Sequence, residues 1–260
     1  MNFQNKTILV TGSGSGMGRV ESKILASRGA KVWVTDISSR SGEAVVDEIV
    51  AADGRAEFYP LDVTSPTSWT ELASLIEESD GDLDGLVNNA GVSHRAGIEE
   101  TTIEDWHRVM EINLSSVFYG MKACAPLLKK GSGGSIVNVS SIAGMLGYFA
   151  AGYGASKWGV RGLSKVGALE FADHKVRVNS IHPGLVDTPL LHSGSSTFVD
   201  TSLKSVPAGR VAEAEEIAES VAFLLSDAAR YITGTEIVVD GGLTSGGIYH
   251  RITSELKAGI

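Results

Sequence analysis

The sequence predicts an α/β fold with a doubly wound parallel β-sheet and helices on both of its faces. Apolar, strand-like runs alternate with helix-like segments along the 260 residues, and a glycine-rich loop joins the first strand-like run to the first helix-like one. This alternation is typical of crossover connections between parallel strands. Strands are expected at Thr7–Val10, Lys31–Asp36, Ala56–Asp62, Leu83–Asn88, Ser135–Ser140, Lys175–Ile181 and Glu236–Asp240. Helices are expected for a segment ending near Gly29 and for Ser41–Ala52, Trp69–Glu78, Ile103–Leu128, Tyr153–Phe171 and Glu213–Leu225.

The composition predicts one domain over residues 1–260. Hydrophobic residues make up 43% of the chain, and no linker-like tract divides it. The net charge of −9 makes nucleic acid and anionic membrane surfaces poor partners. We expect a cytoplasmic protein, because the N-terminal residues lack a secretory pattern, no apolar run is long enough to span a membrane, and Cys124 is the single cysteine.

The glycine-rich loop has the spacing G-x-x-x-G-x-G, from Gly12 through Gly16 to Gly18. Glycines let the backbone approach a phosphate closely, and a helix that begins here offers free N–H groups at its positive end. The loop, which includes Ser15 and Met17, therefore predicts a dinucleotide site at the end of the first strand.

The choice of cofactor depends on Asp36, which closes the second strand. A carboxylate in this position can accept hydrogen bonds from both ribose hydroxyls and opposes a 2′-phosphate, so NAD is expected. Arg40 could bind such a phosphate, but the loop carries no basic residue at Ser13 or Ser15. Asp62 and Val63 follow the third strand and are expected to contact adenine. Asn88–Gly91 follows the fourth strand and is either a cofactor contact or a structural turn.

Candidate catalytic groups are Tyr153 and Lys157, which lie one helical turn apart on the same face. A free phenol has a pKa near 10, so a base at neutral pH requires about 4 kcal/mol of preference for phenolate, which an ammonium at roughly 4–5 Å can supply. Ser140 and Ser141 precede them at a strand end. Asn113 interrupts an apolar helix face, and we expect either a water relay from it to Lys157 or a satisfied core amide.

The chain resembles the short-chain dehydrogenase/reductase family in its small single-domain form, from Lys6 to Gly242. The resemblance rests on T-G-x-x-x-G-x-G at Thr11–Gly18, N-N-A-G at Asn88–Gly91, Asn113, the serine pair, Y-x-x-x-K at Tyr153–Lys157, Pro183-Gly184 and Asp240-Gly241-Gly242.

The resemblance implies a Rossmann fold, a homotetramer, and a catalytic set of Asn113, Ser141, Tyr153 and Lys157. The family's usual serine–tyrosine spacing points to Ser140 instead, whereas the match through Gly144 selects Ser141. It also implies that Val186 and Thr188, after Pro183-Gly184, contact the nicotinamide carboxamide. The expected cofactor-binding residues are Gly12, Ser15, Gly16, Met17, Gly18, Asp36, Asp62, Val63, Asn89, Ala90, Gly91, Tyr153, Lys157, Pro183, Gly184, Val186 and Thr188.

The substrate pocket is expected to be apolar and partly aromatic, with a lid at about 188–207 and a C-terminal tail at 243–260 that crosses to a neighbouring subunit. Its expected lining is Ser141, Tyr148, Phe149, Leu185 and Leu190. No acidic pair or arginine cluster in the sequence indicates a phosphorylated or carboxylated substrate, and no metal site is expected.

These features predict an NAD-dependent oxidoreductase that interconverts a bulky, largely apolar secondary alcohol and its ketone, of the steroid, aryl-carbinol or aryl-amino-alcohol type. The chain is similar in this respect to hydroxysteroid dehydrogenases of the family. The alternatives are a ketoreductase acting on 3-oxoacyl groups of acyl carrier protein, and a non-catalytic module that senses NAD.

Overall fold

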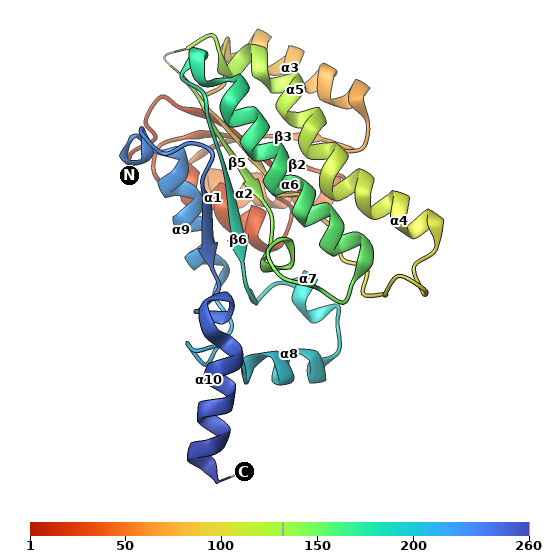
Figure 1. Ribbon diagram of the computed structural model, residues 1–260. Coiled ribbons are helices and arrows are strands. Elements are labelled where there is room, and N and C mark those ends of the chain that lie inside the picture. Colours follow the sequence, from red (N-terminus) through yellow and green to blue (C-terminus); the bar gives the residue numbers. More distant parts are fainter. Residues whose placement is uncertain (132, 260) are drawn as a thin grey trace.

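A computed structural model describes residues 1–131 and 133–259 and contains one parallel sheet (Figure 1). The strand order β3-β2-β1-β4-β5-β6-β7 confirms the predicted fold class. The strands begin and end within a few residues of the predicted bounds. They are β1 (Thr7–Thr11), β2 (Lys31–Asp36), β3 (Arg55–Pro60), β4 (Gly85–Asn88), β5 (Ser135–Val139), β6 (Arg177–Pro183) and β7 (Glu236–Val239).

Helices cover both faces of the sheet, and each face has its own apolar core (Figure 1). On one face lie α1 (Gly16–Ser27), α2 (Ser39–Ala51) and α9 (Ala214–Leu225). On the other lie α3 (Pro66–Asp80), α4 (Ile103–Met110), α5 (Ser116–Leu128) and α6 (Ala151–Glu170). The strands between the two layers are apolar on both sides, which explains why they appear in the sequence as continuous apolar runs.

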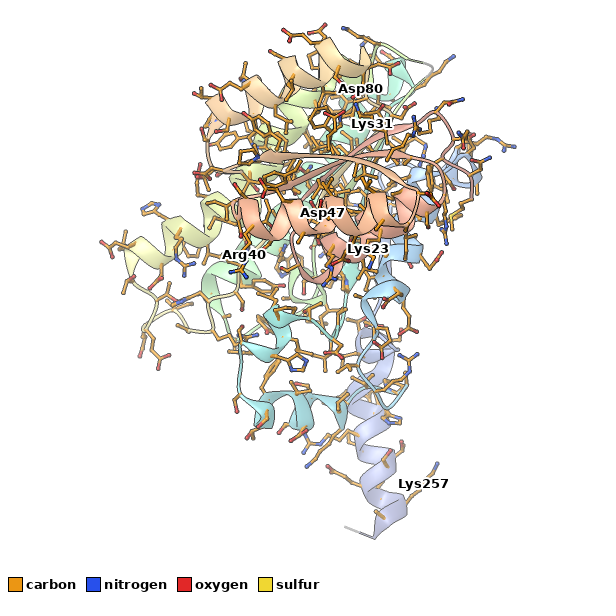
Figure 2. All side chains as sticks on the ribbon, turned by 180° about the vertical axis from the view of Figure 1, so that it is seen from behind. Lys23, Lys31, Arg40, Asp47, Asp80 and Lys257 are labelled. Carbon is orange, nitrogen blue, oxygen red and sulfur yellow. The ribbon has the colours of Figure 1, made fainter. Side chains whose placement is uncertain are left out.

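The strand order reverses between β1 and β4, so the connections that leave these two strands run in opposite directions. A crevice therefore opens beyond their carboxyl ends, where ligands of doubly wound sheets bind. The opposite end of the sheet is closed by ion pairs. The Lys31 Nζ atom lies 2.7 Å from Asp80 at the end of α3 (Figure 2).

The predicted single helix over Ile103–Leu128 is wrong in one respect, because a π-helical turn, η1 (Glu111–Ser115), separates α4 from α5. The turn contains Asn113, whose side chain is fully buried. This amide bonds the backbone of Val92 instead of lying on a regular helix face. A wider turn at a functional position is a recurrent feature of helices.

The segment predicted as an irregular lid contains two short helices, α7 (Pro189–His192) and α8 (Ser196–Leu203). Thr188 caps α7 by accepting a hydrogen bond from the backbone of Leu191. The predicted tail is also helical. Helix α10 (Leu243–Ala258), kinked at Gly246, extends away from the rest of the chain (Figure 1). Residue 260 of that tail lies outside the described residues. None of the described helices is both long and apolar enough to cross a membrane.

Candidate active site

The glycine loop between β1 and α1 has the geometry that its sequence predicts. Gly12 and Gly16 have φ angles of 63° and 53°, in the left-handed region that favours glycine. A side chain at Gly18 would lie 2.5 Å from the Gly12 carbonyl oxygen and from the amide nitrogen of Asn89. The loop thus brings the N-terminus of α1 to the mouth of the crevice with its backbone exposed to a ligand.

A cavity of about 610 Å³ occupies the crevice. Most of the residues predicted to bind the cofactor line it, but Gly18, Pro183, Gly184 and Val186 do not. Those that line it are Gly12, Ser15, Gly16, Met17, Asp36, Asp62, Val63, Asn89, Ala90, Gly91, Tyr153, Lys157 and Thr188. Lining residues that the sequence analysis missed are Ile37, Leu61, Thr64, Val92, Arg108, Glu111, Ile112, Val139 and Pro189. No motif marks these positions, because they reach the cavity only through the packing of separate elements.

Asp36 is held by two backbone donors at the end of β2. One carboxylate oxygen accepts from the N–H of Gly14 at 3.0 Å and the other from the N–H of Ser38 at 2.9 Å. A side chain at Gly14 would lie 2.9 Å from the same carboxylate, so glycine is required there. Arg40 is exposed at the beginning of α2 (Figure 2).

The turn after β4 is fixed by Thr11, which the sequence analysis did not single out as a site residue. The Thr11 hydroxyl accepts hydrogen bonds from the N–H groups of Asn89 and Ala90 at 3.1 and 3.0 Å, and the Asn89 amide donates to the Thr11 carbonyl at 2.9 Å. The side chain of Asn89 is therefore used to hold the turn, while the same three residues, Asn89 to Gly91, form part of the cavity wall. The structural interpretation of this segment is confirmed, and the contact with a cofactor stays a prediction.

Tyr153 and Lys157 lie together at the floor of the cavity, as their spacing predicts. The Lys157 Nζ atom donates to the carbonyl of Val139 at 2.9 Å and lies 5.7 Å from the centre of the Tyr153 ring. Burial lowers the pKa of Lys157 to about 8.

The expectation that Lys157 lowers the pKa of Tyr153 is not met by the residues of this chain alone. Burial raises the pKa of Tyr153, and the opposing contributions come from a hydrogen bond with the Ser141 hydroxyl and from the charge of Arg95. The physical reason is desolvation, because a phenolate enclosed by protein loses its hydration. Arg95 lies between β4 and α4 and was not among the predicted site residues.

The geometry separates the two candidate serines. Ser140 contributes to the cavity surface, but its hydroxyl donates to the Lys157 carbonyl at 2.8 Å and so ties β5 to α6. The Ser141 hydroxyl accepts from the N–H of Ala143 at 3.1 Å and is close enough to Tyr153 to oppose the rise in its pKa. The geometry therefore favours Ser141 as the hydroxyl that acts beside the phenol.

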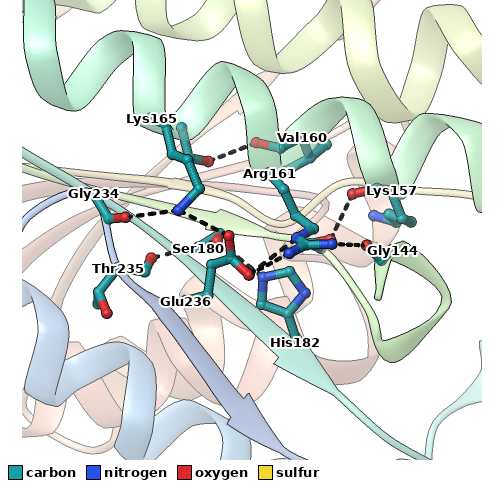
Figure 3. Close-up of polar contacts among 12 residues, drawn as sticks. Gly144, Lys157, Val160, Arg161, Lys165, Ser180, His182, Gly234, Thr235 and Glu236 are labelled. Atoms are coloured by element: carbon teal, nitrogen blue, oxygen red, sulfur yellow. Dashed lines mark hydrogen bonds and ion pairs between the residues drawn. The ribbon is translucent and has the colours of Figure 1, made fainter. Parts of the chain in front are cut away.

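A polar network lies beneath the Ser141–Gly144 turn (Figure 3). Arg161 donates to the Gly144 carbonyl at 2.6 Å and to the carboxylate of Glu236 at 2.8 and 3.0 Å. His182 donates from Nδ1 to the Ser141 carbonyl at 3.0 Å, and its Nε2 atom lies 3.0 Å from the Ser180 hydroxyl. Burial lowers the pKa of His182, so the neutral ring is favoured, with one nitrogen donating and the other accepting.

Asn113 reaches the site from η1 with its amide paired. Its oxygen accepts from the N–H of Val92 at 2.8 Å, and its nitrogen donates to the Val92 carbonyl and to the Ser156 hydroxyl at 2.9 and 3.2 Å. Both Asn113 and Lys157 flank Gly91, where an added side chain would contact each of them. Asn113 is thus a satisfied core amide that also lies next to the lysine, while the predicted water relay stays a prediction.

The predicted aromatic wall lies beside Tyr153. Ring centres are 5.8 Å apart for Tyr148 and Tyr153, 4.6 Å for Tyr148 and Phe149, and 5.7 Å for Phe149 and Phe198 of α8. Of the residues predicted to line the substrate pocket, Leu190 of α7 lines the cavity in the crevice. Ser141, Tyr148, Phe149 and Leu185 do not, and Leu185 uses its carbonyl to accept from the N–H of Ala212.

Comparison with known proteins agrees with this geometry. A family model described as enoyl-(acyl carrier protein) reductase matches residues 12–244. A solved structure described as a short-chain type dehydrogenase/reductase from Mycobacterium ulcerans superimposes with a TM-score of 0.90 at 33% identity, covering 95% of this chain and 92% of that one. The chain belongs to the short-chain dehydrogenase/reductase family. It is therefore an oxidoreductase of a family whose dehydrogenases use nicotinamide cofactors.

The names of several similar proteins describe dehydrogenases of ring alcohols. A cyclohexanol dehydrogenase of an Acinetobacter species is 42% identical over 94% of this chain and 96% of its own. A trans-4-hydroxycyclohexanecarboxylate dehydrogenase of Sinomonas cyclohexanicum is 41% identical over 93% of each chain. A 3-alpha-(or 20-beta)-hydroxysteroid dehydrogenase of Mycobacterium tuberculosis is 41% identical over 93% of this chain and 90% of its own.

Proposed function

We propose that this protein is an NAD-dependent dehydrogenase that interconverts a cyclic secondary alcohol with a mainly apolar body and its ketone. The observation that carries the proposal is that Tyr153 and Lys157 line, beside the Ser140–Ser141 turn, a cavity that the Asp36 carboxylate also lines. The aromatic wall beside Tyr153 suits a ring. The names of the cyclohexanol and hydroxysteroid dehydrogenases support the same substrate class.

The residues of the crevice fit NAD. The glycine loop and the N-terminus of α1 would hold the pyrophosphate, and the carboxylate of Asp36 would accept hydrogen bonds from the adenosine ribose. Lys157 and Thr188 line the part of the cavity near Tyr153 and would hold the nicotinamide end. When bound there, NAD supplies the carbon that exchanges a hydride with the substrate and, in its oxidised form, a positive charge.

Residues of this chain would transfer the proton of the substrate hydroxyl. Tyr153 would take that proton during oxidation and return it during reduction, while the Ser141 hydroxyl would hydrogen-bond the substrate oxygen and hold it against the phenol. Lys157 would stabilise the phenolate, because it lies on the same side of the helix and is itself fixed by the Val139 carbonyl. Asn113 would keep Val92 and the adjacent turn in place.

Replacement of Tyr153 by phenylalanine tests the proposal. We expect Tyr153→Phe to bind NAD with unchanged affinity and to lose about 10²–10⁴ in kcat for cyclohexanol, because only the proton-transferring hydroxyl is removed. The control is Tyr59→Phe. It removes a phenol on β3 that bonds Glu71 of α3, outside the site, and should leave the affinity for NAD and kcat unchanged.

The outcomes separate the alternatives. Turnover that persists in Tyr153→Phe contradicts the proposed role of the phenol. Reduction of 3-oxoacyl thioesters with NADPH, without oxidation of ring alcohols, would identify a ketoreductase of the acyl-carrier type. Binding of NAD without turnover of either substrate class by the unaltered protein would identify a sensing module.

The remaining parts of the proposal concern the lid, the assembly and the location. Residues 188–207 would act as the substrate lid, since Phe198 of α8 already contacts Phe149. A homotetramer is supported by the exposed apolar side chains of α6, where Trp158, Val166 and Leu169 are 49%, 57% and 83% exposed. The apolar residues of α10, including Ile248 and Tyr249, are available for a neighbouring subunit. Light scattering would test the tetramer, and fractionation of the cells the cytoplasmic location.

A further inference from the structure

Arg95 lies in the segment between β4 and α4 and reaches across the crevice to the lid. Its guanidinium donates to the Ser193 hydroxyl at 3.0 Å and to the Leu190 carbonyl at 2.8 Å. It packs directly on Gly194, where an added side chain would lie 2.9 Å from the central guanidinium carbon. The lack of a side chain at Gly194 therefore makes room for the guanidinium.

The charge of Arg95 has no acidic partner among the described residues. Other arginines, such as Arg161, Arg210 and Arg251, each have a carboxylate within 4.0 Å. Arg95 has none, and its buried Nε atom has no hydrogen-bond partner in the described part of the chain. An arginine has five N–H donors, of which the lid oxygens take two. Arg95 is only partly buried, so its charge is held in place by the lid while its remaining donors are available to an acceptor that enters the crevice.

This cation is not among the residues that line the cavity, but it lies next to the end that Tyr153 and Leu190 line. Arg95 lies near enough to Tyr148 and Tyr153 for its charge to oppose the rise in pKa that burial causes in both phenols. The lid residue that it bonds, Leu190, lines the cavity. A ring bound against Tyr148 and Phe149, with its hydroxyl at Tyr153, would therefore have a positive charge close to its substituents.

We propose that Arg95 is a specificity-determining residue that recognises a carboxylate on the ring of the alcohol substrate. The inference rests on the proposed function and adds one anionic group to an otherwise apolar substrate. A carboxylate fits the planar donor fork of a guanidinium better than a neutral acceptor does. Nothing in the sequence marks Arg95, because a single arginine forms no cluster. Its selectivity for a carboxylate would come from the lack of an ion-pair partner among the described residues.

The test compares substrates that differ only in charge. The probes are trans-4-hydroxycyclohexanecarboxylate and its methyl ester, with kcat/KM measured for each under saturating NAD. We expect the unaltered protein to favour the carboxylate at least tenfold. Arg95→Leu should lose about 10- to 100-fold on the carboxylate, in line with a lost hydrogen-bonded charge pair, and much less on the ester. The kcat/KM of Arg95→Lys for the carboxylate should lie between those of the unaltered protein and Arg95→Leu.

A matched control separates recognition from support of the lid. Ser193→Ala removes one lid partner of Arg95 but leaves the charge, so it should change the two kcat/KM values by the same factor. Equal losses on both probes in Arg95→Leu, or no preference for the carboxylate in the unaltered protein, would overturn the assignment.

A binding measurement distinguishes failure of this inference from failure of the proposed function. Cyclohexanecarboxylate should raise the Tm of the NAD-loaded protein more than cyclohexanecarboxamide does, and Arg95→Leu should abolish the difference. Turnover of the ester with rejection of the carboxylate refutes the role of Arg95 alone. No turnover of any ring alcohol refutes the proposed function, and the thermal shifts then still decide whether Arg95 binds the anion: equal shifts with the two compounds refute it.

Discussion

Glu21 lies on the buried face of α1, the helix that packs against α9, and its side chain is inaccessible to solvent. Neither carboxylate oxygen has a hydrogen-bond partner among the described residues. Burial raises the pKa of Glu21 from its ordinary 4.5 to about 8. We therefore expect Glu21→Gln, which keeps the shape and removes the ionisable group, to make the protein more stable at neutral pH.

The size of the effect follows from the shift in pKa. Between 4.5 and about 8 the folded protein holds a proton on Glu21 that the unfolded chain has released, so the free energy of unfolding falls as the pH rises through this window. Below the lower value there is no penalty, and above the upper value the penalty is complete. At about 1.36 kcal/mol per pKa unit, the penalty at pH 7 is about 3 kcal/mol.

Urea unfolding of the two proteins at several pH values measures this difference. Glu21→Gln should be about 3 kcal/mol more stable near pH 7 and equal to the unaltered protein below about pH 5. The control is Glu48→Gln, at a partly exposed residue whose pKa is lowered by hydrogen bonds from Arg19 and Lys23, and which should show no gain. If the unaltered protein and Glu21→Gln lose stability in parallel from pH 5 to pH 8, Glu21 is ionised when buried and the reasoning is wrong.

Two further predictions follow from the site. Arg161→Met should lower kcat about tenfold and leave the KM for NAD within about twofold in steady-state kinetics. The turn that carries Ser141 would lose the hydrogen bond that Arg161 donates to it, a loss worth about 1–3 kcal/mol. The control Lys165→Met should show little change, because the Lys165 ammonium bonds Glu236 but not the turn. Asp36→Asn keeps an oxygen that can accept from the loop but removes the charge, so the ratio of kcat/KM for NAD over NADP should fall at least about tenfold; an unchanged ratio would show that this carboxylate does not select the cofactor.

Local patterns were enough to predict the elements that carry the chemistry. The glycine spacing needs only one strand, one turn and one helix, and the pair Tyr153 and Lys157 shares a helix face whatever surrounds it. The apolar runs predicted the inner strands because both faces of the sheet are covered there, whereas the edge strands β3 and β7 are partly exposed. The bounds differ where a neighbouring element supplies the last hydrogen bonds, as in β6, which continues to Pro183 through its pairing with β7.

Long-range contacts decided the features that the sequence did not predict. The helix predicted across Asn113 is broken because Val92, far away in the chain, supplies the partners of its amide. The choice between Ser140 and Ser141 depends on which hydroxyl meets the carbonyl of Lys157 and which meets the phenol. The pKa of Tyr153 depends on burial, and the spacing of Tyr153 and Lys157 in the sequence does not show how deeply the phenol is buried.

The sequence by itself determined the order of the elements, the glycine-rich loop, the acidic residue at the end of β2 and the tyrosine–lysine pair, because each depends on residues close together in the chain. Only the tertiary structure decided which ionisable side chains are left without partners: Arg95 bonds the end of α7, about a hundred residues away, and has no ion-pair partner among the described residues, and Glu21 is enclosed by packing. The reason is physical. Backbone conformation follows from local preferences, whereas desolvation and charge pairing depend on every group that folding brings within a few ångströms.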